Sequence, residues 1–170
     1  MQNWSGFYAT IAAAAASLLG LLFVAVSINA TESLGPGHED SRRLAEQGFQ
    51  NYLAVLVVAL LSLMPDISRQ TLGLITVSVT LAWSVWVLLR FYQSLVDVHR
   101  SKSRISSIRR HAVSLLGFAM LIYSGLRMGF GPPDSGDNYI FGAALIVLMS
   151  SATLASWELL LRISRFKRPL

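Results

Sequence analysis

The chain lacks cysteine and has few charged side chains. Without cysteine it contains no disulfide, no thiolate metal site and no cysteine nucleophile, and the redox compartment cannot be inferred. Charged residues make up 14% of its 170 residues and hydrophobic residues 54%, whereas soluble proteins average about 25% charged residues. The length predicts one domain, and the composition predicts a membrane protein.

Catalytic and ligand-binding motifs are also missing. No pair of histidines is placed to ligate a haem within a membrane, and no H-E-x-x-H, EF-hand or phosphate-loop pattern occurs. The apolar runs lack the Ser and His, or the two Asp, of an intramembrane protease. Glu158 lies too near the end of its run to serve a proton or ion pump. We therefore expect no enzyme, no cofactor and no metal site.

Apolar runs separated by charged segments dominate the chain. Each is near the length needed to cross about 30 Å of hydrocarbon, and they cover 6–29, 48–64, 70–89, 112–130 and 139–161. The first run has no basic region before it, so we expect a retained helix rather than a cleaved signal peptide. The pattern predicts an all-α polytopic membrane helical bundle, residues 1–170 forming one transmembrane domain of five helices.

The basic residues predict the orientation of this bundle. One side holds two Lys and Arg residues in the loop at 30–47, six in the basic segment 90–110 and four in the tail, whereas the other side holds Arg69 and Arg127. If the weak run at 112–130 were a re-entrant loop, the four basic residues of the tail would lie opposite the basic segment and the bias would be much weaker. The positive-inside rule favours five spans, with the N-terminus outside and the C-terminus and basic segment cytoplasmic.

The basic segment also predicts a lipid contact, because clustered basic residues beside a span attract anionic headgroups. The candidate headgroup residues are Arg100, Lys102, Arg104, Arg109 and Arg110. The alternative is a topology signal without a lipid site. The net charge of +5 is explained by topology and anionic lipid, so we expect no nucleic-acid partner.

Small residues recur every seven positions in the first run, opposite its large apolar residues. This small face consists of Gly6, Ala13, Gly20 and Ser27. It predicts a close helix contact, because helices in lipid associate by packing. The contact is either ordinary packing inside one subunit or a subunit-contact or pore-lining face. Leu at position 13 or 20 should prevent assembly, and Leu at Ala14 or Ala15 should be milder.

The third run, 70–89, carries another face of small and hydroxyl side chains, which consists of Gly73, Thr76, Thr80 and Ser84. We expect these hydroxyls to bond to their own backbone or to a neighbour, and a hydrated face is the alternative. Gly125 and Gly129 form a GxxxG, a weak motif in a short run. The turn at Pro65 predicts a tight antiparallel hairpin of runs two and three.

The topology brings several polar residues to one depth near the cytoplasmic side. This polar layer contains Asn29, Gln47, Gln50, Asn51, Arg90, Glu158 and Arg162. One hypothesis makes it the cytoplasmic mouth or gate of an assembly, with Asn51 and Glu158 the most consequential members. The alternative is an interfacial cap with a Glu158–Arg162 pair.

The first run, FYATIAAAAASLLGLLFVAVSIN, and the arm NYLAVLVVALLSLMP that follows it resemble a diffuse group of small uncharacterised bacterial multi-pass inner-membrane proteins. The likeness covers runs one to three. It implies a bacterial inner (cytoplasmic) membrane location and no specific activity.

Two functions follow from these faces. The first is a self-associating protein, a homo-oligomer that forms a pore or channel for ions or small solutes. The second is a non-catalytic regulatory or assembly subunit that binds a larger membrane protein partner. Carrier-type transport ranks third, since five runs do not divide into an inverted repeat.

Overall fold

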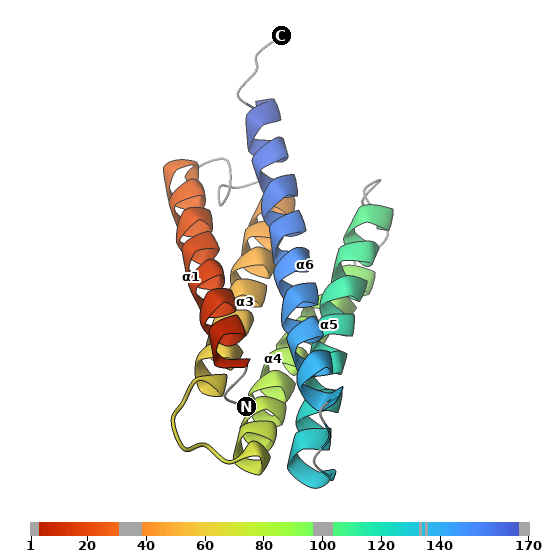
Figure 1. Cartoon of the computed structure of the whole chain (residues 1–170). Helices are drawn as coiled ribbons and strands as arrows, with labels where there is room; N and C mark the ends of the chain where they lie inside the picture. Colours follow the sequence, from red (N-terminus) through yellow and green to blue (C-terminus); the bar gives the residue numbers. More distant parts are fainter. Residues whose placement is uncertain (1–3, 31–38, 97–103, 133, 135, 167–170) are drawn as a thin grey trace.

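The computed structural model describes residues 4–30, 39–96, 104–132, 134 and 136–166, and these residues form five helices and no strand (Figure 1). The helices are α1 (Ser5–Ile28), α3 (Glu39–Ser62), α4 (Arg69–Val96), α5 (Arg104–Phe130) and α6 (Gly136–Phe166). The first turn of α1 and the last turn of α6 lie at opposite ends of the bundle (Figure 1). The all-α prediction is therefore confirmed.

The helices extend beyond the apolar runs. α3 begins at Glu39, well before the predicted start at 48, and both flanks of the basic segment 90–110 are helical, to Val96 and from Arg104. Hydropathy marks only the part of a helix that suits a bilayer, whereas Glu, Lys and Arg are good helix formers in the turns beyond it. The predicted runs are accurate as apolar segments but too short as helices.

Within the described residues, four helical stretches are long and apolar enough to cross a membrane, by length and composition. They are Ser5–Ile28, Ser41–Ser62, Ala112–Phe130 and Gly136–Ser164. The third of these matches the weak run at 112–130. These lengths and compositions suggest a multi-pass membrane protein.

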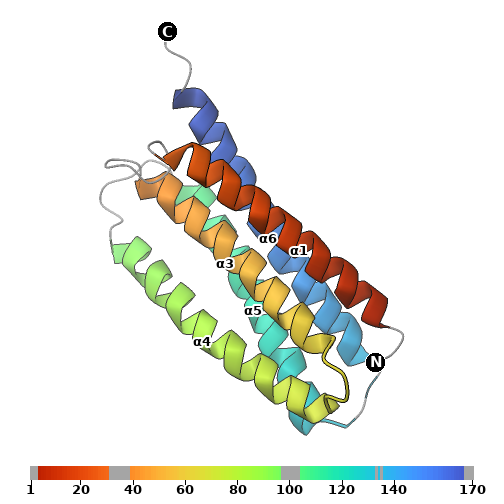
Figure 2. The same cartoon turned by 90° about the vertical axis from the view of Figure 1, so that its left-hand side faces the viewer.

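The helices pack in a spatial order that differs from their order in the chain. α1 packs mainly on α3, α3 on α6, α6 on α5 and α5 on α4, so α1 and α4 lie at the two edges (Figure 2). The prediction of a tight hairpin of runs two and three is therefore wrong for the packing. α3 and α4 are joined by a short turn, yet α4 packs chiefly against α5. The packing faces of α3 are occupied by α1 and α6.

The short connections have identifiable caps. The hydroxyl of Ser68 accepts a hydrogen bond from the backbone N–H of Thr71 at 3.1 Å, which satisfies one of the free donors at the start of α4. Asp66 before it has a φ of 59°, a left-handed conformation that Asp tolerates better than most residues. The carboxylate of Asp134 accepts from the N–H of Gly136 at 3.1 Å, at the start of α6.

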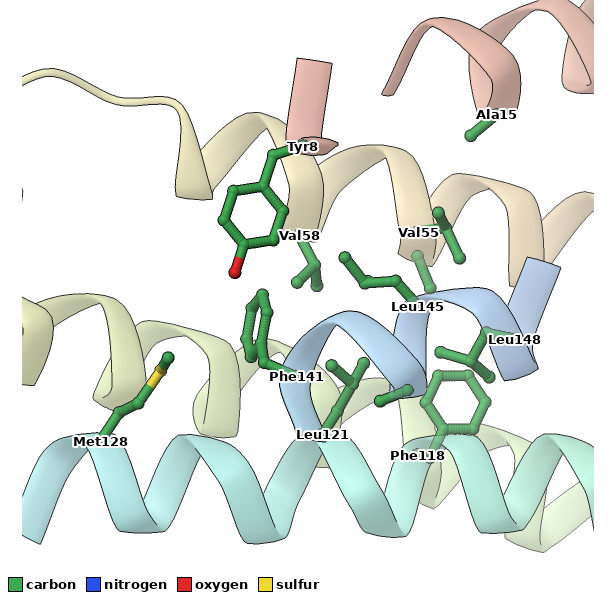
Figure 3. Packing of buried hydrophobic residues seen from close by; sticks show 12 residues of the cluster. Tyr8, Ala15, Val55, Val58, Phe118, Leu121, Met128, Phe141, Leu145 and Leu148 are labelled. Atoms are coloured by element: carbon green, nitrogen blue, oxygen red, sulfur yellow. The ribbon is translucent and has the colours of Figure 1, made fainter. Parts of the chain in front are cut away.

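Two apolar clusters fill the bundle. Figure 3 shows the first, in which side chains from α1, α3, α5 and α6 point toward one another, for example Tyr8, Val58, Phe118 and Phe141. The second lies nearer the end that carries the last turn of α6 and includes Leu22, Leu44, Ala155 and Leu159. On α6 the first cluster ends at Leu148 and the second begins at Ala152. The buried polar residue Ser151 lies between them.

Candidate functional site

A hydrogen-bonded polar centre joins three helices between the two apolar clusters. The amide nitrogen of Asn51 on α3 donates to the Ser114 hydroxyl on α5 at 2.8 Å and to the Ser151 hydroxyl on α6 at 3.3 Å. The two hydroxyls lie 2.8 Å from each other, and all three side chains are 1% exposed. The Gln47 amide, one turn before Asn51, donates to Ser114 at 3.2 Å.

Close helix contacts hold this polar centre in place. A Cβ on Gly48 would lie 3.1 Å from a methyl of Leu22 and 3.2 Å from the Ser156 hydroxyl, so α3 lies tightly against both α1 and α6. A Cβ on Gly117 would lie 2.7 Å from Leu148, so α5 approaches α6 equally closely. The glycines let the short Ser114 and Ser151 hydroxyls reach each other and Asn51.

The chemistry of the polar centre is limited to hydrogen bonding. Its groups are two amides and two hydroxyls, none of which titrates near neutral pH. Among the described residues no group of three or more His, Cys, Asp and Glu side chains could hold a metal ion. The centre therefore acts as a specific contact between α3, α5 and α6 inside the protein.

The remaining polar-layer residues divide among separate places. Asn29 donates to the Ala25 carbonyl at 2.9 Å on its own helix, and Glu158 pairs with Arg162 at 3.1 Å on α6, where both side chains are half-buried. Gln50 lines a groove between α1 and α3. The side chain of Arg90 lies outside the described ones. Among the side chains of the predicted layer that the structure describes, Gln47 and Asn51 join the polar centre.

A second polar cluster lies at the end of the bundle that carries the first turn of α6. The buried Asp137 carboxylate on α6 contacts the guanidinium groups of Arg69 on α4 and, at 3.3 Å, Arg127 on α5. Arg69 also donates to the carbonyls of Met128 and Gly131, at 3.3 and 3.2 Å. Because the last carbonyls of a helix lack partners in it, Arg69 acts as a C-terminal cap for α5.

The sequence pattern does not predict this cluster. It identifies Arg69 and Arg127 as the basic residues of the less basic side, and it places Asp134 and Asp137 in a turn without a site. The signal was present, because two Arg and two Asp at the same end of a bundle are a charge-balanced set.

The small face of α1 points away from the bundle. Gly6, Ala13, Gly20 and Ser27 are all exposed, and no described neighbour lies within 4 Å of a Cβ built on either glycine. α1 packs instead through Tyr8, Ala12, Ala15 and Leu22. The interpretation as ordinary packing inside one subunit is therefore wrong. In lipid, burial does not favour one apolar face over another, so the sequence pattern alone does not determine whether the small or the large face of α1 packs inside the subunit.

The prediction that Leu at Ala15 has a mild effect is also wrong. Ala15 is 0% exposed and belongs to the first apolar cluster. Leu at this position would overpack the core. Ala14, which is half-buried, remains a suitable control.

The glycines of α4 and α5 form a very close helix contact. A Cβ on Gly73 would lie 2.6 Å from the Gly125 carbonyl oxygen and 2.7 Å from the Gly129 nitrogen. The GxxxG of Gly125 and Gly129 thus forms the α4–α5 crossing. A Cβ on Gly73 would meet backbone atoms of α5, whereas a Cβ on Gly125 or Gly129 would first meet the side chain of Val77 or Leu74, so the demand for glycine is strongest at Gly73.

The hydroxyl face of α4 departs from expectation. Thr10, Ser17, Ser62 and Ser78 each donate to the carbonyl four residues earlier. By contrast, the buried hydroxyls of Thr76, Thr80 and Ser84 have no hydrogen-bond partner among the described residues. The expectation that this face satisfies its own hydroxyls is wrong at these three positions.

Two candidate headgroup residues, Arg100 and Lys102, lie outside the described residues. Arg104, Arg109 and Arg110 lie on the first turns of α5, and their side chains lie outside the described ones. The lipid contact of the basic segment therefore stays a prediction.

Comparison with known proteins provides no relative for this arrangement. No protein-family model, no curated protein and no solved structure matches the chain.

Proposed function

We propose that this chain is a five-span membrane protein that associates with further copies of itself through the outward face of α1 and forms a pore for ions or small solutes. α4 is the fifth span, since its run 70–89 carries no charged side chain. The proposed orientation has the N-terminus outside a bacterial inner membrane and the basic segment in the cytoplasm. There the headgroup residues Arg100, Lys102, Arg104, Arg109 and Arg110 attract anionic lipid.

The position of the small-residue face carries this proposal. α1 is an edge helix: 17% of the residues in its most apolar stretch are buried, compared with 50% in the most apolar stretch of α3. Its outward surface has a strip of Gly, Ala and Ser beside the exposed side chains of Leu21 and Phe23. Strips of small residues let membrane helices approach closely, so this surface is better suited to contact a second helix than to contact lipid.

A path between chains is favoured over one through a single chain. The described interior of one chain holds two apolar clusters and a polar centre whose groups bond to one another. The exposed side of α1, in contrast, carries the hydroxyls of Thr10 and Ser17. A hydroxyl that donates to its own backbone still accepts hydrogen bonds, so these residues supply a neutral polar lining.

The alternative function is a regulatory or assembly subunit of a larger membrane complex. The observation that favours it is the same exposed face, because a helix of a different protein fits a small-residue strip as well as another copy does. The two functions differ in particle mass and in flux.

The test measures the mass of the nanodisc-embedded particle and solute or ion flux in vesicles. We expect a defined homo-oligomer for the natural chain, and monomers without flux for Ala13→Leu and Gly20→Leu. Ala14→Leu is the matched control and should keep both properties. A natural chain that is monomeric and carries no flux under any gradient would exclude the pore, and a distinct protein bound in native lipid would support the subunit.

A further inference from the structure

An apolar groove opens on the side of the bundle between α1 and α3. It has a volume of about 320 Å³, at the lower end of the range of roughly 300–1,000 Å³ for small-molecule sites. Its apolar wall comes from Leu22, Phe23 and Val26 of α1 and Phe49 of α3. Phe23 and Phe49 remain exposed at its edges. This lining suits a hydrocarbon chain.

Polar groups lie on the α3 wall of the groove. Gln50 and Glu46 both line it, and the Glu46 carboxylate pairs with the Arg42 guanidinium one turn earlier at 3.0 Å. Arg42 is the more exposed partner, at 61% against 27% for Glu46. The groove wall thus carries the negative charge of Glu46, and the positive charge of Arg42 lies next to it on the more exposed side of the pair.

The groove lies at the end of the apolar part of the bundle. Val26 is in the last turn of α1, which ends at Ile28, and α3 carries its charged residues in the turns before Phe49. With the membrane placement proposed above, on which this inference rests, the rim lies at headgroup depth and the apolar wall extends into the acyl region.

We propose that this groove binds one acyl chain of a phosphatidylethanolamine molecule, with the lipid ammonium at Glu46 and the lipid phosphate at Arg42. The two charges of the headgroup match the two charges of the rim. A primary ammonium donates charge-assisted hydrogen bonds to a carboxylate, whereas the quaternary ammonium of phosphatidylcholine has no N–H to donate. The carboxylate of Glu46 opposes a headgroup that is only anionic.

The experiment titrates the detergent-purified full chain with phosphatidylethanolamine, phosphatidylcholine or phosphatidylglycerol of identical acyl chains and counts bound lipid by native mass spectrometry. We expect one phosphatidylethanolamine to bind at least about fivefold more tightly than the other two. Glu46→Gln should abolish this preference. Glu158→Gln, which breaks the other Glu–Arg pair at four-residue spacing, should keep it.

A second variant tests the apolar wall. Val26→Trp fills the groove and should remove the bound lipid of every class, with helix content measured by circular dichroism to show that the chain is folded. Equal affinity for the three lipids, or an unchanged preference in Glu46→Gln, would overturn the proposal. If Val26→Trp lowers the particle mass while lipid binding persists, the occupant is a second copy instead. If the natural chain shows the lipid preference but carries no flux, the lipid site is supported and only the pore proposal fails.

Discussion

The carboxylate of Asp137 on α6 and the guanidinium of Arg69 on α4 form an ion pair between helices that belong to different parts of the chain. Asp137 is 2% exposed, and Arg127 of α5 contacts its other oxygen. Three helices are therefore fastened at one end by a single buried acid. The same Arg69 caps the carbonyls at the end of α5.

Replacing Asp137 by Asn should destabilise the bundle. The change removes the buried counter-charge of Arg69 and Arg127, but because these two side chains are 24% and 37% exposed, the cost should be below the roughly 3–5 kcal/mol of a fully buried pair. Asp134→Asn is the control, because Asp134 is 55% exposed in its pair with Arg127 and Asn caps helices as well as Asp does. Unfolding in mixed micelles measures both, and equal effects would show that the buried pair has no special weight.

Substitutions at the glycines should follow the space around each one. Gly73→Ala should cost the most, on the order of 1–3 kcal/mol, because the new Cβ would meet backbone atoms of α5. Gly129→Ala should cost less, since its nearest contact is a flexible Leu74 methyl at 3.3 Å.

Gly6→Ala and Gly20→Ala are the controls for this series. Neither Cβ would meet a described neighbour, and Ala favours a helix by up to about 1 kcal/mol over Gly. Both should be neutral or stabilising in the same unfolding measurement. A cost at Gly20 that appears only at assembling concentrations would instead report a contact between copies.

Thr80→Val should leave stability unchanged or raise it by about 1 kcal/mol, because an unsatisfied buried hydroxyl carries a desolvation penalty that an isosteric methyl removes. Thr10→Val is a suitable comparison, since it deletes a hydroxyl that already bonds to the Gly6 carbonyl. A clear loss of stability or of flux in Thr80→Val would mean that this hydroxyl bonds to water or a solute in the working protein, as the alternative of a hydrated α4 face predicts.

Asn51→Leu should weaken the contact of α3 with α5 and α6 by about 1–3 kcal/mol, because two buried hydroxyls lose a shared donor. Gln50→Leu should be nearly neutral, since Gln50 lies at an open groove. Comparing unfolding with flux separates the roles. If Asn51→Leu alters flux while stability is unchanged, the mouth hypothesis for the polar layer gains support over the packing role.

Much of the architecture follows from local features of the sequence. The apolar runs, the turn at Pro65 and the segregation of Lys and Arg depend on residues close together in the chain, so length, hydropathy and charge were enough to predict an all-α, membrane-type fold. The same holds for the two opposite faces of α1, because the seven-residue spacing alone predicts that Ala13 and Gly20 lie opposite the large apolar residues. In the structure Leu22 is buried, whereas Ala13 and Gly20 are exposed.

Which faces meet was decided only by the tertiary structure. Nothing local tells whether the small or the large face of α1 points inward, because both are apolar and lipid rewards packing rather than burial. Likewise, Gly73 meets Gly125, Asn51 meets Ser114 and Arg69 meets Asp137 because α4 packs on α5 and because α3 packs on α6 rather than on α4, its neighbour in the chain. Spacing along one helix records its own period and not the identity of its neighbour, so these pairs depend on how all five helices fill space together.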